Sequence, residues 1–314
     1  MDLRDLRYFI AVAEEGHVTR AAERLGMQQP PLSQLIKAME RELDVQLFYR
    51  KPRGVELTDA GRAFLDNARA TLSQFDHTFE TTRRTARGEQ GRICVGYSTQ
   101  AAVHPLFLRI IRKFREAFPL VSVTLAHGFP DDLFERMRKD QIDAIFTRVP
   151  SADLDDVVIN TLLREAMVVA LPCGHVLAQR KNGGDSALAW KVLASETFIF
   201  VARRPGLLPS PGNLEIEACK LAGFNPRIGH IVADNISRLA FVGVGLGISL
   251  VAASMQRLNI EGVVFRRLKG APQPKFPFNL ATRRGDASAV VRNFLKLAKQ
   301  TARNYHANLG KAYY

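Results

Sequence analysis

Hydrophobic positions near the start of the chain recur at the spacing of an amphipathic helix. In residues 3–13 they are Leu3, Leu6, Phe9, Ile10 and Ala13. This i, i+3, i+4, i+7 pattern predicts a helix, which Gly16 ends. A shorter helix is predicted over residues 19–25, and Gly26 stops it because glycine readily adopts the left-handed conformation that follows a helix.

A third helix is predicted after a turn at residues 27–29. Pro30 and Pro31 suit its first turn, where a missing N–H breaks no hydrogen bond. Its core positions are Leu32, Leu35, Ile36, Met39 and Leu43. Two short extended segments follow at residues 46–49 and 54–57, joined by a basic turn. Helix, short helix, tight turn, helix and hairpin form the layout of a winged helix-turn-helix.

A long helix is predicted over residues 59–87, which contain no proline. Its apolar positions step by three and four along a narrow seam: Leu65, Ala68, Leu72, Phe75 and Phe79. Such a seam is typical of a helix that pairs with a second helix, and packing on its own domain is the alternative. Residues 88–91 begin and end with glycine and are interpreted as a hinge.

Beyond residue 91, short apolar strands alternate with amphipathic helices, which favours an α/β sheet domain. Strands are predicted at residues 93–96, 121–125, 143–147, 166–171, 197–201 and 247–251, and helices at 106–118, 133–138, 214–222, 236–242 and 288–304. The predicted domains are therefore residues 1–58, a linker helix and hinge at 59–90, and an α/β domain at 91–314.

The charge balance adds a complication to this picture. The chain has 44 Lys and Arg against 31 Asp and Glu, a formal net charge of +13, which indicates an anionic partner. Residues 1–90 hold 14 basic and 14 acidic side chains, whereas residues 91–314 hold 30 basic and 17 acidic ones. The whole surplus therefore belongs to the α/β domain and not to the predicted helix-turn-helix.

Several classes of protein are disfavoured by the sequence. The start, MDLRDLRYFI, lacks the pattern of a secretory signal, and the apolar run 239–253 is short and interrupted by glycines, so no membrane association is expected. Three cysteines and seven histidines show no metal-ligand spacing, and reduced thiols in the cytoplasm are expected. No Walker, GxSxG or HExxH motif is present, so we expect no enzyme activity, no metal and no cofactor.

Residues 18–61, VTRAAERLGMQQPPLSQLIKAMERELDVQLFYRKPRGVELTDAG, closely resemble the signature of LysR-type transcriptional regulators. The resemblance extends over the whole chain, including DAIFTR at residues 143–148, residues 165–171 and VGVGLGISLVA at residues 242–252. It implies a winged helix-turn-helix head, a linker helix, and an effector-binding domain like periplasmic binding proteins. That domain would have two α/β subdomains, subdomain I at about residues 91–163 and 268–304 and subdomain II at about residues 164–267.

The resemblance also implies partners. These are promoter DNA, a second copy bound through the linker helix, a homotetramer as the usual assembly, RNA polymerase, and a small organic-acid effector. It leaves activation and repression both open. The alternatives are a solute-binding sensor or an enzyme that uses the same bilobal fold without regulating DNA.

Base reading is expected from the first turns of the third helix, which enter the major groove in this motif. The candidates are Gln28, Gln29, Pro30, Pro31, Ser33, Gln34 and Lys37, with Arg50, Lys51 and Arg53 of the wing placed for phosphates or the minor groove. Glutamine pairs with adenine and proline packs on a thymine methyl. For Gln34 and Lys37 the alternative is a solvated helix face.

Four positions depart from the family pattern. Gln28 stands where serine is common, and Gln34-Leu35 replaces the frequent Arg-Gln, so base preference is affected rather than DNA binding itself. His17 stands where a capping serine is favoured, which predicts that the short helix lacks its usual cap.

Effector candidates follow the strands of the α/β domain. Ser98, Thr99 and Gln100 come after the first strand and open a helix, and Arg148 ends a later strand. Ligands gather at the carboxyl ends of such strands, and arginine binds carboxylates bidentately. The pattern resembles the branch that responds to aromatic-catabolite carboxylates, in which Phe129, Val201 and Arg203 are also expected to line the cleft. The alternatives are a surface salt bridge for Arg148 and simple helix capping for Ser98 and Thr99.

Overall fold

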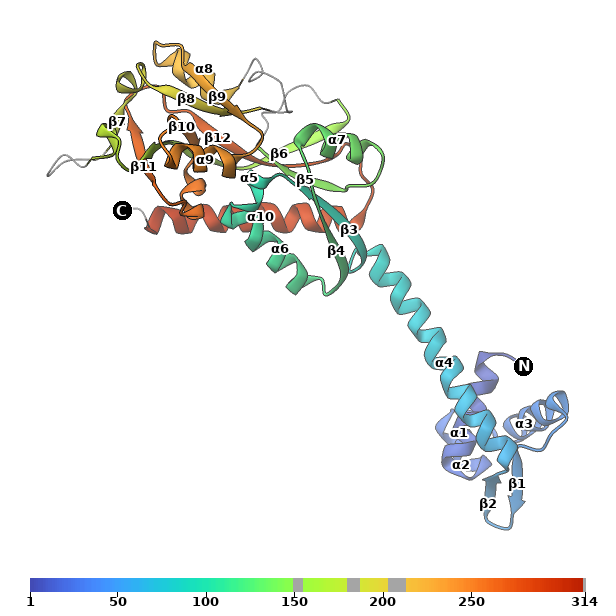
Figure 1. Ribbon diagram of the computed structural model, residues 1–314. Helices are drawn as coiled ribbons and strands as arrows, with labels where there is room; N and C mark the ends of the chain where they lie inside the picture. The colour runs from blue at the N-terminus through green and yellow to red at the C-terminus, as the bar shows by residue number, and fades with distance from the viewer. Residues whose placement is uncertain (149–154, 180–186, 203–212, 313–314) are drawn as a thin grey trace. The chain divides into compact units, whose positions relative to one another are not determined.

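The computed structural model describes residues 1–148, 155–179, 187–202 and 213–312, with side chains of the last helix described to residue 306. Arg203, an expected effector contact, lies outside the described residues. The chain divides into two compact units, Met1–Arg84 and Thr85–Tyr314, which we call the head unit and the effector unit. Each is described by itself below, with the elements labelled as in Figure 1.

The head unit is a winged helix-turn-helix followed by a long helix. Its elements are α1 (Leu3–Glu15), α2 (Val18–Arg24), α3 (Gln29–Leu43), β1 (Phe48–Lys51), β2 (Gly54–Leu57) and α4 (Asp59–Ala86), which runs on to the unit boundary. The predicted helices are confirmed within two residues at each end. The apolar face of each helix enters one core, in which Phe9 contacts Phe48 of the wing and Phe64 of α4. One hydrophobic cluster therefore joins the helices, the wing and the start of the linker helix.

The effector unit is a mixed α/β domain. Its strands are β3 (Gln90–Tyr97), β4 (Leu120–His127), β5 (Ala144–Thr147), β6 (Val157–Pro172), β7 (Leu188–Ala189), β8 (Thr197–Val201), β9 (Arg227–Val232), β10 (Ser249–Ala252), β11 (Val263–Lys269) and β12 (Lys275–Arg283). Its α-helices are α5 (Thr99–Ala102), α6 (Pro105–Ala117), α7 (Pro130–Arg138), α8 (Leu214–Leu221), α9 (Asn235–Gly243) and α10 (Ala289–Ala312), and its 3₁₀ turns are η1 (Val176–Ala178), η2 (Trp190–Leu193) and η3 (Ala253–Leu258).

One sheet runs through the effector unit in the order β4-β3-β5-β12-β6-β11-β7, with β10 also paired to β6. β3, β4 and β5 are parallel, whereas β12 is antiparallel to both β5 and β6. The parallel pair β8 and β9 forms a separate small sheet. In Figure 1, α6 and α10 lie on one face of the β3–β4–β5 end, and contacts between α10 and β3 agree with this.

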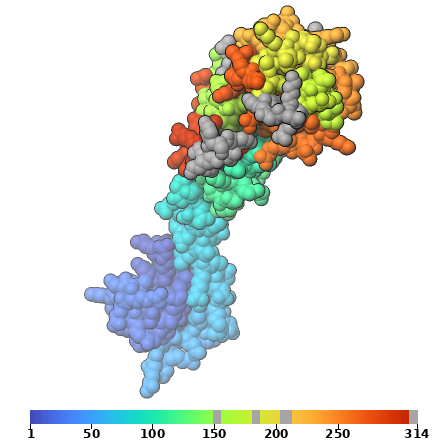
Figure 2. Space-filling model, turned by 90° about the vertical axis from the view of Figure 1, so that its left-hand side faces the viewer, coloured from blue at the N-terminus to red at the C-terminus, as the bar shows by residue number. Residues whose placement is uncertain are grey.

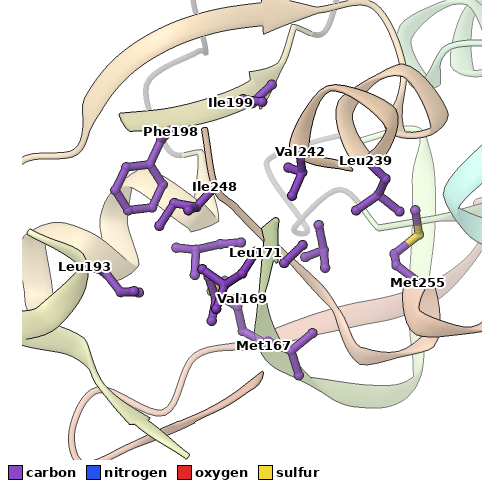
Figure 3. Packing of buried hydrophobic residues seen from close by; sticks show 14 of the residues in the cluster. Met167, Val169, Leu171, Leu193, Phe198, Ile199, Leu239, Val242, Ile248 and Met255 are labelled. Atoms are coloured by element: carbon purple, nitrogen blue, oxygen red, sulfur yellow. The ribbon is translucent and has the colours of Figure 1, made fainter. Parts of the chain in front are cut away.

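The sixteen-residue strand β6 connects two hydrophobic cores. Its first half, with Leu162 and Leu163, packs into the cluster that also holds Phe146, Phe278 and Phe294. Its second half enters the other cluster, whose members Met167, Val169, Leu171, Phe198, Ile248 and Met255 are shown in Figure 3. Residues 164–166 belong to neither cluster and form the boundary between them. β12 also enters both clusters, through Phe276 on one side and Phe278 on the other, so the effector unit contains two lobes that share these two strands.

Two sequence-based expectations need correction. β6 was predicted only at residues 166–171, and β7, β9, β11 and β12 were not predicted at all. The hinge at residues 88–91 stays a prediction, and in the structure Gly91 belongs to β3 while Gly88 lies against the start of α10. A Cβ on Gly88 would lie 2.5 Å from the carbonyl carbon of Ala289, so only glycine fits this contact.

The described residues contain neither a membrane-spanning helix nor a cluster of metal-ligating side chains. No helix in this part of the chain is both long and apolar enough to span a bilayer. No group of three or more His, Cys, Asp or Glu side chains within it is arranged to hold a metal ion.

Candidate nucleic-acid interface and ligand site

The residues expected to read bases lie together on one surface of the head unit. Gln28, Gln29, Pro30, Pro31, Gln34 and Lys37 are exposed, and Ser33 is half-buried. Gln28 occupies the N-cap position of α3 but its side chain makes no capping hydrogen bond, so its amide is available. On the opposite face, Leu32, Ile36 and Met39 are buried and hold the helix against α1 and α2. The exposed face can therefore present donors and acceptors from a rigid support.

The wing is held in place by a close backbone contact. Val55 N–H donates to the carbonyl of Gly16 at 2.9 Å, and a Cβ on Gly54 would lie 2.2 Å from that oxygen. Gly54 also has a φ of 133°, a conformation that side-chain-bearing residues rarely adopt. At the tip, Lys51 pairs with Glu56 at 3.2 Å, whereas Arg50 and Arg53 are exposed without an ion pair among the described residues. The two arginines are the wing cations open to phosphate.

The acidic residues at the start of the head are occupied within the protein. Asp2 caps α1, and Glu14 pairs with Arg24 at 3.0 Å and with Arg69 of α4 at 2.8 Å. Glu15 also pairs with Arg24. These carboxylates belong to α1 and its partners rather than to α3 or the wing. The neutral total of the head therefore conceals a separation between surface ion pairs around α1 and the first turn of α3, which contains no acidic residue.

The expectation that α2 lacks a cap is wrong. His17 occupies the N-cap position in an extended conformation, and its Nδ1 accepts a hydrogen bond from the Thr19 N–H at 3.3 Å. A neutral imidazole has one acceptor nitrogen, so it can take the role of the usual hydroxyl.

The seam of α4 divides into two parts. Ala68 is buried and Leu65 packs on the core of the head, so packing on the unit's own core accounts for this half. Phe75 and Phe79 are 37% and 51% exposed, with ring centroids 4.8 Å apart. The second half thus forms an apolar patch that no other part of the head unit covers.

In the effector unit, three of the expected ligand contacts follow adjacent strands. Tyr97, at the end of β3, is in register with His127 of β4 and with Phe146 of β5. Ser98, Phe129 and Arg148 come one or two residues later on these three strands. The parallel pairing therefore places all three at one edge of the sheet, as predicted from the carboxyl ends of the strands.

Simple helix capping does not describe the hydroxyls at this edge. Ser98 is the N-cap residue of α5, yet its side chain makes no capping hydrogen bond. The Thr99 hydroxyl contacts Nε2 of His127 at 3.0 Å, and Gln100 is half-buried in the first turn. The Ser98 hydroxyl and the first backbone N–H groups of α5 are thus left for another acceptor or donor.

Arg148 is almost fully buried at the boundary between the two cores. Its Nη2 donates to Oε2 of Glu165 at 2.7 Å and to the Ser254 hydroxyl at 3.1 Å, and its guanidinium lies over the Phe278 ring at 5.4 Å. The expected alternative, a surface salt bridge, is wrong in one respect, because the two side chains are only 5% and 11% exposed. Nε and Nη1 are buried and have no hydrogen-bond partner among the described residues. Three N–H groups of a buried cation are thus unused.

His104 completes this cluster as a neutral group. Burial, followed by the nearby Arg148 and Arg257 charges, lowers the pKa of His104 to about 3. Its Nδ1 accepts from the Leu106 N–H at 3.0 Å, so the proton of the neutral ring lies on Nε2, which is 3.8 Å from Oε2 of Glu165. The ring stacks on Phe278 at 4.5 Å. His104 therefore adds polarity but no charge beside the ion pair.

Sequence reasoning missed Glu165, Ser254 and His104. Glu165 carried a usable signal, because a carboxylate directly before the apolar run at residues 166–171 needs a partner if it is buried. Ser254 lies 89 residues later and only the fold brings it there. Val201 ends β8 in the other sheet, and no described hydrogen bond, ion pair or ring contact connects it with the Ser98 edge.

Comparisons with known proteins agree with this architecture. The model for the bacterial regulatory helix-turn-helix protein, lysR family, matches residues 3–62, and the model for the LysR substrate binding domain matches residues 86–303. The chain is 33% identical to the HTH-type transcriptional regulator AlsR of Bacillus subtilis, over 99% of this chain and all of that protein. It is 32% identical to BudR of Raoultella terrigena, over 95% of this chain and all of that protein. The structure of full-length CbnR bound to its target DNA has a TM-score of 0.81 and 29% identity, covering 96% of this chain and all of that one.

Proposed function

Because the chain belongs to the family of LysR-type transcriptional regulators and is a DNA-binding regulator with an effector domain, we propose that Arg148 binds the carboxylate of its effector. The observation that carries the proposal is the buried guanidinium with three unused N–H groups at the carboxyl edge of the sheet. A buried, unsatisfied donor costs about 1–3 kcal/mol, so a ligand that satisfies it gains affinity.

The rest of the site follows from the same edge. The Ser98 hydroxyl and the start of α5 would hold a second polar group, and Phe129, 40% exposed at the start of α7, would pack on the apolar body of the ligand. A small organic acid, aromatic or dicarboxylic, matches these contacts. The proposal is that the protein binds this acid without converting it chemically. We place this regulator in the cytoplasm, where it would meet promoter DNA.

Control of DNA binding follows from a difference in affinity. An effector can change the balance between two forms of the protein only by the difference between its affinities for them. The Arg148–Glu165–Ser254 cluster joins β5, β6 and η3 at the boundary of the two cores, so a ligand there affects both lobes. RNA polymerase is the partner that would read the resulting change at the promoter.

The test is titration calorimetry of the full-length protein with a panel of aromatic and dicarboxylic acids. Arg148→Lys keeps a cation beside Glu165 but removes the planar set of donors. We expect at least tenfold weaker binding of the acid that binds the wild type. Arg283→Lys is the matched control, because Arg283 pairs with Asp143 at the opposite end of β5. Wild-type affinity in Arg148→Lys would exclude the proposed site.

Footprinting of the chain's own upstream DNA with and without the bound acid then tests the regulatory step. The expected result is a changed pattern of protection with the acid in the wild type and no change in Arg148→Lys. An acid that binds tightly but leaves the footprint unaltered would favour a sensor role without control of DNA.

We also propose that α4 pairs with the same helix of a second copy to form a homodimer, from which a tetramer is built. The exposed Phe75 and Phe79 patch supports this. Sedimentation of the Phe75→Glu, Phe79→Glu double variant is expected to show monomers. Ser73→Glu, on the opposite side of α4, serves as the control and should keep the wild-type mass.

A further inference from the structure

The largest concentration of positive charge in the protein lies on two adjacent helices of the effector unit. α6 and α10 together contain nine basic residues and one acidic residue, Glu116. They account for +8 of the +13 formal surplus in fewer than forty residues. After Asp286 the sequence contains no acidic residue at all. An ordinary solvated helix face carries both signs, so this composition requires an explanation.

On α10 the charges form a straight stripe. Arg292, Lys296, Lys299 and Arg303 recur in steps of four, three and four, which places them on one side of the helix. All four are exposed, whereas Phe294, Ala298 and Ala302 on the other side are buried against the sheet. At 1.5 Å per residue the stripe is about 16 Å long.

α6 extends this surface beside the stripe. The two helices are antiparallel, because Phe114 near the end of α6 contacts Phe294 near the start of α10, and Arg109 near the start of α6 lies over the Tyr305 ring at 5.1 Å. Arg109 therefore lies beside α10, and α6 carries three further exposed cations: Arg112, Lys113 and Arg115. Red atoms of the C-terminal segment reach the surface in Figure 2.

None of these eight side chains forms an ion pair with a described residue. Elsewhere in the effector unit, Arg138, Arg148, Arg238 and Arg283 each have a carboxylate partner within the protein. We call the eight cations the α6–α10 basic face. With no carboxylate partner among the described residues, its charge attracts solvent ions, which a polyanion would release on binding.

We propose that the α6–α10 basic face binds the phosphate backbone of double-stranded DNA that flanks the operator. The chain's own DNA-binding head supports this choice of polyanion, because a bound operator holds the adjoining duplex at high effective concentration near the effector unit. Duplex DNA carries one phosphate per about 1.7 Å of axis, so a stripe of this length faces several phosphates at once. Five of the eight cations are arginines, which bind phosphate bidentately.

A membrane surface matches this face less well. The exposed side of α10 interposes Gln300 and Asn304 between its cations and presents no apolar residue at the described positions. Membrane-surface helices insert apolar side chains beside their basic ones. The α10 stripe therefore has the charge of a lipid-binding helix without its hydrophobic component, although Leu108 of α6 is 57% exposed.

The test compares two full-length variants of equal charge. The stripe variant carries Arg292→Gln, Lys296→Gln, Lys299→Gln and Arg303→Gln. The control variant carries Arg227→Gln, Arg267→Gln, Lys269→Gln and Lys275→Gln, four exposed cations of the same unit outside α6 and α10. All eight substitutions replace exposed side chains, and circular dichroism checks that both variants keep the fold.

Binding is measured against salt concentration with two duplexes from the chain's own upstream DNA. One is limited to the footprinted operator and the other includes flanking DNA. For the long duplex we expect the stripe variant to lose up to about 0.9 in the slope of log K against log salt for each phosphate contact removed. Its binding to the short duplex, and all binding by the control variant, should equal that of the wild type.

Two results would overturn the proposal. One is a wild-type slope for the stripe variant on the long duplex. The other is an equal loss in both variants, which would show a bulk-charge effect. Cosedimentation with anionic phosphatidylserine vesicles is the third measurement, and vesicle binding that depends on the stripe while the DNA slope stays unchanged also rejects DNA as the partner. Because effector titration plays no part here, failure of this proposal is distinguishable from failure of the Arg148 site.

Discussion

The head unit and the effector unit use charged residues in opposite ways. In the head, ion pairs such as Arg69–Glu14 lie at the surface, with both side chains at least one-third exposed, and no charged side chain is buried. In the effector unit, two Arg–Glu pairs are buried, Arg148–Glu165 between the cores and Arg238–Glu215 between α9 and α8. In contrast, eight exposed cations of the effector unit gather on α6 and α10, where none of them forms an ion pair with a described residue.

This difference shows what each unit can recognise. A surface that reads base edges needs donors and acceptors at fixed positions, and an apolar core supplies the rigid support for them. A site for a small ion gains from burial, because low polarity strengthens each hydrogen bond and excludes water. Net charge therefore points to an anionic partner without locating the residues that recognise it.

The largest effect is expected from breaking the buried pair. Arg148→Met leaves the Glu165 carboxylate buried without a cation, which typically costs about 3–5 kcal/mol. Arg69→Ala removes a surface pair of the head and should cost about 0.2–1 kcal/mol. Urea unfolding followed by circular dichroism measures both. Equal losses in the free energy of unfolding for the two variants would show that the buried ion pair contributes no more to stability than the surface pair.

The next largest effect concerns DNA. Gln29→Ala and Ser33→Ala should weaken operator binding by about 1–3 kcal/mol for each lost base contact, with little change on random duplex. Arg53→Ala should weaken binding to both duplexes, because a phosphate contact carries no sequence information. Gel shifts with the operator duplex and with a random duplex give the ratio of the two affinities for each variant. A uniform loss on operator and random DNA for all three variants would contradict the assignment.

The third largest effect is a pH dependence of stability that we expect in the effector unit, because of His104. The pKa of His104 is about 3 in the folded protein and near 6.5 when unfolded, so the unfolded chain binds more protons between these values. The contribution of the neutral ring to stability is thus complete above pH 6.5 and falls as pH decreases toward 3. Between pH 6.5 and 5 we expect a loss of about 1.5 kcal/mol, by the linkage slope of about 1.4 kcal/mol per pH unit.

His104→Asn tests this assignment. Asparagine is a good N-cap residue, so the start of α6 keeps a capping group while the titrating ring is removed. Urea unfolding at pH 7 and pH 5 should show that the free energy of unfolding depends less on pH in the variant than in the wild type. The same pH dependence in both proteins would mean that groups other than His104 cause it.

The smallest effect is expected at the start of α2. His17→Ala removes the Nδ1 acceptor and should destabilise the head by about 1 kcal/mol, whereas His17→Ser should restore the loss. Thermal unfolding monitored by circular dichroism measures both variants. No difference between alanine and serine would show that the imidazole does not cap the helix.

The sequence by itself determined most of the head unit. Helical periodicity, Gly26 and the two prolines located α1, α2 and α3, because these are local features that need no distant partner. The same reasoning found α6, α7, α8 and α9 within three residues. It also indicated the sheet edge where Ser98 and Arg148 lie, since strand ends in a parallel sheet meet at one side.

The strands that join the two cores were beyond local reasoning. Pro277 argues against a strand within residues 275–283, yet β12 forms there and pairs with β6 along its length. Its pairing with β5 covers only Asn279–Thr282, so Pro277 lies in a part of β12 with a neighbour on one side, where proline is tolerated. Register and neighbours, which the chain acquires only on folding, decided this strand.

The partners of Arg148 were likewise decided by tertiary structure. Glu165 is seventeen residues away and Ser254 more than a hundred, and both reach the guanidinium because β6 and η3 meet at the boundary of the cores. Local sequence specified which residues can ionise and which faces are apolar. Burial, which turns an ordinary ion pair into a costly and selective site, depends on every element around it and so appears only in the folded chain.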